Sequence, residues 1–220
     1  MPIYNSPLKQ VDAAETRRYA GLAKASFDEK KIQSACLDAQ LLADPKGIWQ
    51  IFDYNASACE VLSSPPFKIE GKKIQQHLEK AQKVVLLAVT IGETIEDQIT
   101  GQFQEGRYAD SLLLDAAATT AVEQAADDME KTIRQYTAPL GYEMIWRFSP
   151  GYGDWKIEAQ PEMLRLSEAE KIGMRVTEAL MLIPRKSITA IIGLIPSQDK
   201  QTEKPSSCQR CTKTDCVARR

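Results

Sequence analysis

Histidine is nearly absent from this 220-residue sequence, which contains only His77. A single histidine excludes a histidine-rich metal site, and no Ser-His-Asp pattern accompanies it. We expect His77 to be a surface residue because it lies in a charged segment. No apolar run approaches the roughly 18 residues of a membrane-spanning helix, and the N-terminal segment does not resemble a secretory signal. The sequence therefore favours a soluble, cytoplasmic protein with no membrane partner.

An excess of charge of one sign is also missing. The chain has 28 Lys and Arg residues against 30 Asp and Glu, a net charge of −2. A duplex-DNA binder needs a concentrated basic face, so this balance argues against a nucleic-acid partner. With 43% hydrophobic residues, the chain has enough apolar side chains for a stable core. We expect one compact domain over residues 1–196, followed by a polar linker and cysteine-rich tail over 197–220.

Hydrophobic periodicity predicts helices and strands without a strict β-α-β alternation. The expected helices cover 12–25, 28–42, 72–82, 109–136 and 161–173, with a further one after Gly92. The expected strands cover 48–54, 67–69, 83–90, 142–148, 175–183 and 187–195, the last two forming a hairpin. Asp12 is the expected N-cap of the first helix, with Glu15 completing a capping box. This pattern predicts an α+β fold, in which helices flank a mainly antiparallel mixed sheet.

The segment RFSPGYGDW, residues 147–155, is the most informative stretch. Its proline and two glycines predict a sharp turn after a strand, where a ligand can approach the backbone closely. Arg147 offers a planar guanidinium suited to a carboxylate, and Tyr152 adds a ring and a hydroxyl. The alternative interpretation is an ordinary Pro-Gly turn with a surface arginine.

Glu123 is a second candidate for a binding residue. It lies in the long helix expected over 109–136, within the small-residue run ATTAVEQAADDM. A carboxylate in such surroundings can receive the ammonium group of a ligand. The alternative is a solvated helix glutamate, which is the commoner situation for this residue type.

Three segments together resemble the S-adenosylmethionine-binding activation domain of cobalamin-dependent methionine synthase, in its free-standing form. They are LLLDAAATTAVEQAADDME, RFSPGYGDW and GMRVTEALMLIPRKSITAIIGL, in this order. The likeness spans about residues 12–196 and includes an Arg-x-Ser/Ala-Pro-Gly-Tyr signature. The implied fold is that of a methionine synthase activation domain.

The resemblance implies a role for five residues. Arg147 matches the arginine that holds the methionyl carboxylate, and Glu123 matches the helix glutamate that receives the amino group. Ser149 and Gly151 match main-chain positions that hold adenine, and Tyr152 matches the motif tyrosine. The implied activity is reductive methylation, in which cob(II)alamin is reduced to Co(I) and takes the methyl group of S-adenosylmethionine. The protein orients the methyl donor and needs no side-chain nucleophile.

The resemblance also implies partners. The sequence has no Asp-x-His-x-x-Gly run, the mark of a corrinoid-binding domain. The cobalamin would therefore be carried by a partner methionine synthase or corrinoid protein, with an electron donor such as flavodoxin or ferredoxin. We expect the docking surface near Arg147–Trp155 and Lys186–Thr189, although a plain hairpin turn is the alternative for residues 184–187.

Three of the five cysteines form a C-x2-C-x4-C pattern in the tail: Cys208, Cys211 and Cys216. Thiolates at this spacing can bind zinc or an iron–sulfur cluster, with Cys36, Cys59 or a second chain as the fourth ligand. The alternatives are a redox-inert tail and a reversible disulfide.

Two other functions stay open. The family has a late binding tyrosine, whereas no tyrosine follows Tyr152 here. This difference favours a non-enzymatic, metal-binding adaptor with a degenerate S-adenosylmethionine pocket. A complete small-molecule methyltransferase is less favoured, because the motif holds no general base.

Overall fold

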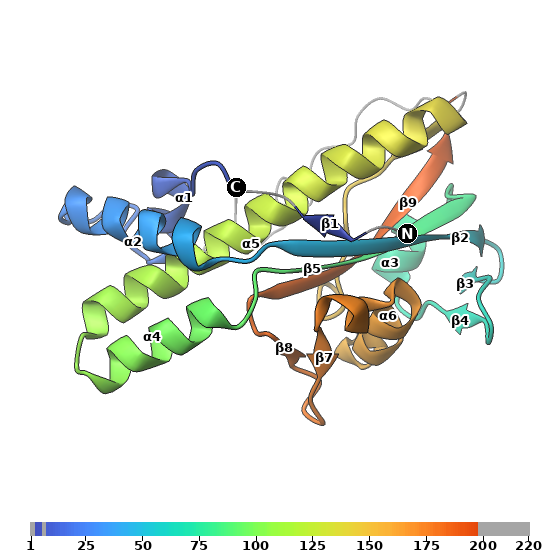
Figure 1. Cartoon of the computed structure of the whole chain (residues 1–220). Helices are drawn as coiled ribbons and strands as arrows, with labels where there is room; N and C mark the ends of the chain where they lie inside the picture. Colours follow the sequence, from blue (N-terminus) through green and yellow to red (C-terminus); the bar gives the residue numbers. More distant parts are fainter. Residues whose placement is uncertain (1–2, 6–7, 198–220) are drawn as a thin grey trace.

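An antiparallel sheet with helices on both faces organises the part of the chain that the computed structural model describes, residues 3–5 and 8–197 (Figure 1). The strands of this sheet are β1 (Tyr4–Asn5), β2 (Lys46–Asn55), β3 (Glu60–Val61), β4 (Phe67–Lys68), β5 (Lys83–Thr90), β6 (Tyr142–Met144) and β9 (Ser187–Pro196). They lie in the order β4-β3-β2-β5-β9-β6, and β1 also pairs with β2. Each of these pairs is antiparallel, so the predicted α+β fold is confirmed.

One long helix crosses a face of this sheet. The helices are α1 (Ala13–Tyr19), α2 (Glu29–Leu42), α3 (Lys72–His77), α4 (Thr94–Gln104), α5 (Tyr108–Thr137) and α6 (Gln160–Ser167). Short 3₁₀ turns cover Ala138–Leu140, Ile157–Ala159 and Ala169–Ile172. Helices α1, α2 and α4 pack against α5, and α6 packs on the sheet from the opposite side (Figure 1). Within the described ranges, no helix is long and apolar enough to span a membrane.

Strand β5 contributes side chains to the hydrophobic cores on both faces of the sheet. Val85, Leu87 and Val89 point into the core that α5 covers, whereas Val84 and Leu86 point into the core formed with α3 and α6. The alternation follows the two-residue period of a strand, and it explains why KVVLLAVT is apolar throughout. Full burial of such a side chain contributes roughly 1.5–3 kcal/mol.

The predicted C-terminal hairpin is wrong. β9 pairs with β5 and β6, not with the segment 175–183. That segment folds back on itself, so that β7 (Arg175–Val176) pairs with β8 (Leu182–Ile183). Thr177 closes the turn between them: its N–H donates to the Met181 carbonyl at 2.9 Å, and its Oγ1 accepts from the Met181 N–H at 3.1 Å.

The helix ends also differ from the predictions. Helix α1 ends at Tyr19 and helix α3 ends at His77, both earlier than predicted. Gly21, which has a φ of +73°, follows the end of α1. Asp12 caps α1 as predicted, accepting from two first-turn N–H groups at 2.8 and 3.0 Å. The capping box does not form, because the Asp12 N–H donates to Gln124 of α5 at 3.1 Å and Glu15 pairs with Arg18 at 2.6 Å.

Candidate functional site

A β-bulge places Arg147 between the sheet and α5. The register pairs Met144 with Leu194, and the next bridge pairs Phe148 with Ile191. Phe148 is four positions after Met144, whereas Ile191 is only three positions before Leu194. The segment from Met144 to Phe148 therefore contains one extra residue. A bulge bends its strand and redirects a side chain. The continuous strand predicted here is therefore interrupted, at the position where Arg147 turns toward α5.

Three carboxylates of α5 surround the Arg147 guanidinium. Glu123 accepts from Nη2 at 2.7 Å, Asp127 accepts from Nη1 at 2.6 Å, and Glu130 also accepts from Nη1. The Arg147 side chain is only 18% exposed. The structure therefore brings Glu123 and Arg147 into direct contact. Asp127 and Glu130 were not among the predicted site residues, although their i, i+4, i+7 spacing from Glu123 places all three carboxylates on one helix face.

The cluster keeps Arg147 charged. Burial by itself lowers the pKa of Arg147, but the charges of Glu130 and Asp127 outweigh it, so the pKa lies above its usual value. A guanidinium has five N–H donors, and three of them donate to these carboxylates. Within the described chain, the Nε–H and one Nη2–H have no acceptor. These two groups are the ones that can receive a carboxylate of a ligand.

An acidic hollow of about 260 Å³ lies beside the cluster, between α1 and α5. Glu123 and Asp127 line it from α5, while Asp12, Glu15 and Tyr19 line it from the α1 side. Four carboxylates therefore face one space. Glu15 pairs with Arg18, while Glu123 and Asp127 pair with Arg147, so a cationic group of a ligand would share these carboxylates with the two arginines.

The turn after Arg147 holds the other three predicted residues. The Gly151 N–H donates to the Trp155 carbonyl at 2.8 Å, and the Tyr152 N–H donates to the Ser149 carbonyl at 3.2 Å. Gly151 has a φ of +87°, which favours glycine there. Because both N–H groups are engaged inside the turn, a ligand would meet carbonyl oxygens and the Tyr152 ring, which is 60% exposed.

Asp154 fastens this turn to α3. Its carboxylate accepts from the Lys73 N–H at 3.1 and 3.2 Å, and thereby satisfies a first-turn donor of a helix whose own N-cap, Gly71, offers no side chain. Asp154→Ala is expected to lower the free energy of unfolding by about 1 kcal/mol, as loss of a helix cap does. Chemical denaturation measures this change, with the exposed Glu178→Ala as the control. An unfolding free energy equal to that of the control would contradict this role.

His77 is not the surface residue that its charged neighbours suggest. It is half-buried, its Nε2 lies 2.8 Å from the Trp146 carbonyl oxygen, and its ring centroid lies 3.9 Å from that of Trp146. Because a carbonyl only accepts, this contact requires the proton on Nε2. His77 therefore supports the backbone directly before Arg147 from the α3 side.

The start of β9 is held by contacts with α4 and α5 and is not an exposed surface. Lys186 Nζ lies 2.8 Å from Asp115 and 2.9 Å from Thr119 on α5, and the Lys186 N–H donates to Glu96 of α4 at 2.7 Å. The Lys186 side chain is 15% exposed and Thr189 is 2% exposed. These two side chains consequently do not form the exposed docking surface that the sequence suggested. Residues 184–187 are not a hairpin turn either, because β8 and β9, which they connect, do not pair with each other.

The tail cysteines Cys208, Cys211 and Cys216 lie outside the described residues, so a metal site there stays a prediction. In the described ranges, no three His, Cys, Asp or Glu side chains are grouped to hold a metal ion. Burial raises the pKa of the Cys36 thiol and so disfavours the thiolate that a metal needs. Cys59 is half-buried.

The fold is similar to that of a known domain. A solved structure of the MetH reactivation domain bound to AdoHcy superimposes with a TM-score of 0.61. The two chains are 15% identical, and the match covers 92% of this chain and 81% of that chain. At this identity the likeness establishes the fold and not the ligand. The sequence matches no protein-family model and no curated protein.

Proposed function

We propose that this protein binds S-adenosylmethionine and supports reductive methylation of a corrinoid cofactor carried by a partner, a methionine synthase or another corrinoid protein. The observation that carries the proposal is the contact of Arg147 with Glu123, at 2.7 Å, in a fold similar to a reactivation domain bound to AdoHcy. Both residues also belong to the sequence segments whose resemblance implies this ligand.

The charges of the site match the functional groups of S-adenosylmethionine, which has a carboxylate, an ammonium and a sulfonium group. The two N–H groups of Arg147 that lack an acceptor in the described chain suit the carboxylate. Glu123, Asp127 and Glu130 place three carboxylates around the guanidinium, and carboxylates are groups to which the ammonium and the sulfonium can be attracted.

The turn after Arg147 is the proposed position of the adenine. The exposed Tyr152 ring can stack on a heterocycle, and main-chain atoms of Ser149 and Gly151 can hydrogen-bond to its edge. A corrinoid on the partner, reduced by a donor such as flavodoxin or ferredoxin, would supply the nucleophile that takes the methyl group and leaves S-adenosylhomocysteine. The residues of this chain bind and orient the methyl donor, an effect worth on the order of several kcal/mol.

Isothermal titration calorimetry of the full chain tests the ligand assignment. Saturable binding of S-adenosylmethionine is expected, and adenosine is expected to bind at least about tenfold more weakly, because it lacks the carboxylate and the ammonium group. Equal affinity for adenosine would contradict the role given to the Arg147 cluster. The absence of any binding of S-adenosylmethionine would contradict the proposed function itself.

A metal-binding adaptor with a degenerate pocket is the second candidate, favoured by the absence of any tyrosine after Tyr152. It predicts no affinity for S-adenosylmethionine. It also predicts zinc or iron in anaerobically purified protein, with the metal lost on Cys208→Ser. Metal analysis of both proteins, together with the calorimetry, separates the two candidates.

A further inference from the structure

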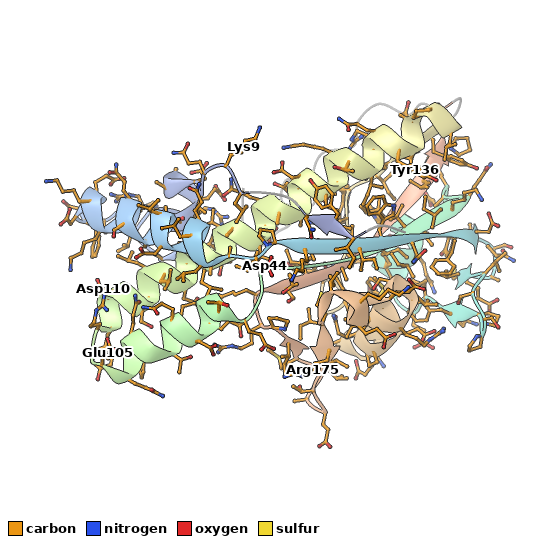
Figure 2. All side chains as sticks on the ribbon, viewed as in Figure 1. Lys9, Asp44, Glu105, Asp110, Tyr136 and Arg175 are labelled. Atoms are coloured by element: carbon orange, nitrogen blue, oxygen red, sulfur yellow. The ribbon has the colours of Figure 1, made fainter. Side chains whose placement is uncertain are left out.

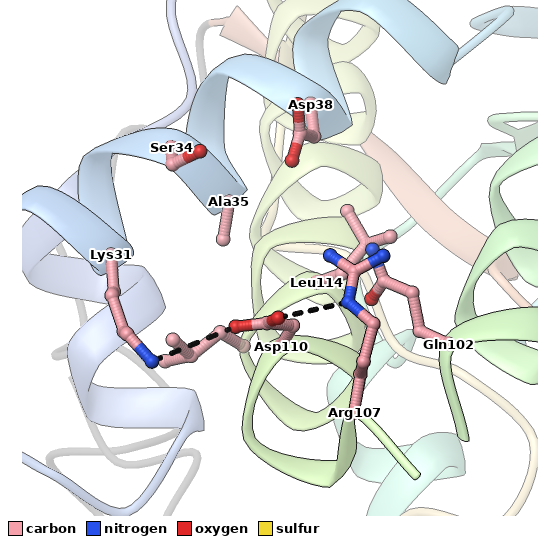
Figure 3. Close-up of a pocket in the computed structure, with 9 residues that line it drawn as sticks. Lys31, Ser34, Ala35, Asp38, Gln102, Arg107, Asp110 and Leu114 are labelled. Carbon is pink, nitrogen blue, oxygen red and sulfur yellow. Dashed lines mark hydrogen bonds and ion pairs between the residues drawn. The ribbon is translucent and has the colours of Figure 1, made fainter. Parts of the chain in front are cut away.

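A second hollow, of about 130 Å³, lies between α2, α4 and α5 (Figure 3). This hollow is near the turn between α4 and α5. Glu105 and Asp110 mark that turn in Figure 2, and Tyr136 lies at the opposite end of the molecule. Asp110 precedes Glu123 by 13 residues of α5, which is about 20 Å at the helical rise. This hollow is therefore separate from the Arg147 cluster.

Gln102 carries an unpaired acceptor in this hollow. Its side chain extends from α4 toward the space between α2 and α5 (Figure 3). The residue is 5% exposed, and its Oε1 is buried with no hydrogen-bond donor among the described residues. A buried polar atom without a partner costs roughly 1–3 kcal/mol. A ligand that donates a hydrogen bond to Oε1 would remove this penalty.

The charged side chains of the hollow indicate the chemistry of such a ligand. Its two cations, Lys31 and Arg107, both pair with Asp110, at 4.0 and 3.1 Å (Figure 3). Asp38 is half-buried on α2 and has no ion pair with any residue of the described chain. The unmatched groups are thus two acceptors, the Asp38 carboxylate and the Gln102 amide oxygen. A hydrogen-bond donor with a positive charge is the kind of ligand group that suits both acceptors.

We propose that this hollow binds a primary ammonium group on a short alkyl chain. An ammonium group has three N–H donors, enough for Gln102 Oε1 and Asp38 together. Ala35, Leu113 and Leu114 also line the hollow and offer apolar contact to methylene groups. Its volume of about 130 Å³ is well below that of a pocket for a drug-sized ligand, so the ligand is a small amine.

Thermal unfolding of the full chain with propylammonium chloride tests this proposal, at an ionic strength matched with sodium chloride. Propylammonium is expected to raise Tm because it binds the native state. Tetramethylammonium has the charge without N–H donors, and propionate has the opposite charge, so neither is expected to raise Tm. Either no rise with propylammonium or an equal rise with tetramethylammonium would overturn the proposal.

Three variants test whether the amine binds in this hollow. Gln102→Met keeps the size of the side chain, so it is expected to raise Tm of the unliganded chain and to abolish the response to propylammonium. Asp38→Asn is expected to weaken the binding by about tenfold or more. Asp97→Asn removes an exposed carboxylate from α4 and is expected to leave the binding unchanged. An undiminished response of Gln102→Met, or an equal loss in Asp97→Asn, would contradict the site.

Discussion

Replacing Arg147 with alanine is expected to weaken the binding of S-adenosylmethionine by about 100-fold, because a partly buried partner of the ligand carboxylate is lost. The same change leaves Glu123, Asp127 and Glu130 on one face of α5 without their shared cation. Loss of one partner from a buried ion pair costs about 3–5 kcal/mol, and the 18% exposure of the Arg147 side chain reduces this figure. We expect a loss of about 2–3 kcal/mol in the free energy of unfolding.

Calorimetry and chemical denaturation measure the two effects separately. Arg147→Lys is the matched variant, since a lysine keeps the positive charge but not the planar, forked donor geometry. It is expected to retain most of the stability and still lose about tenfold in affinity. Wild-type affinity in a folded Arg147→Ala protein would show that the ligand carboxylate is held elsewhere.

Gly193→Val is expected to lower the free energy of unfolding by about 1–3 kcal/mol, the range for overpacking a filled core. A Cβ at Gly193 would lie 2.8 Å from Ile145 Cδ1 and 3.1 Å from the Ala81 Cβ. Ile145 begins the bulged segment, and its N–H donates to the Gly193 carbonyl at 3.0 Å. Displacement of Ile145 should therefore also shift Arg147, so that ligand affinity falls together with stability.

Gly101→Ala is the control for this substitution. Gly101 lies in α4, and a Cβ there meets no atom within 4 Å. Alanine is expected to stabilise this helix position by about 0.5–1 kcal/mol relative to glycine. Chemical denaturation of both variants measures the difference. A Gly193→Val protein as stable as the wild type would show that the contact between β9 and the bulge is loosely packed.

The elements that were predicted well are those with strong local patterns. The apolar run of β5 and the long alanine-rich pattern of α5 are visible in the sequence itself, and both elements form within a few residues of the predicted ranges. The Asp12 cap is likewise local, because its partners are in the next turn of the chain. The order of the strands along the chain was enough to predict a mainly antiparallel sheet.

The features that were missed depend on tertiary contacts. The bulge before Phe148 arises from the register between β6 and β9, which no local pattern encodes. Asp127 and Glu130 resemble ordinary solvated helix residues until Arg147 is placed between them and the sheet. The half-buried position of His77 depends on the Trp146 backbone, 69 residues away. The sequence thus singled out Arg147 and Glu123 as candidates, but it did not indicate that Asp127 and Glu130 also contact Arg147.

A crystal structure of the full chain with S-adenosylmethionine is the most direct test of ligand binding at Arg147. We expect the amino-acid carboxylate to lie within hydrogen-bond distance, about 3 Å, of the Arg147 guanidinium. We also expect the ammonium group beside Glu123 and the adenine over the turn that contains Tyr152. A nucleoside bound elsewhere, with Arg147 still paired to its three α5 carboxylates and to nothing else, would contradict the central claim.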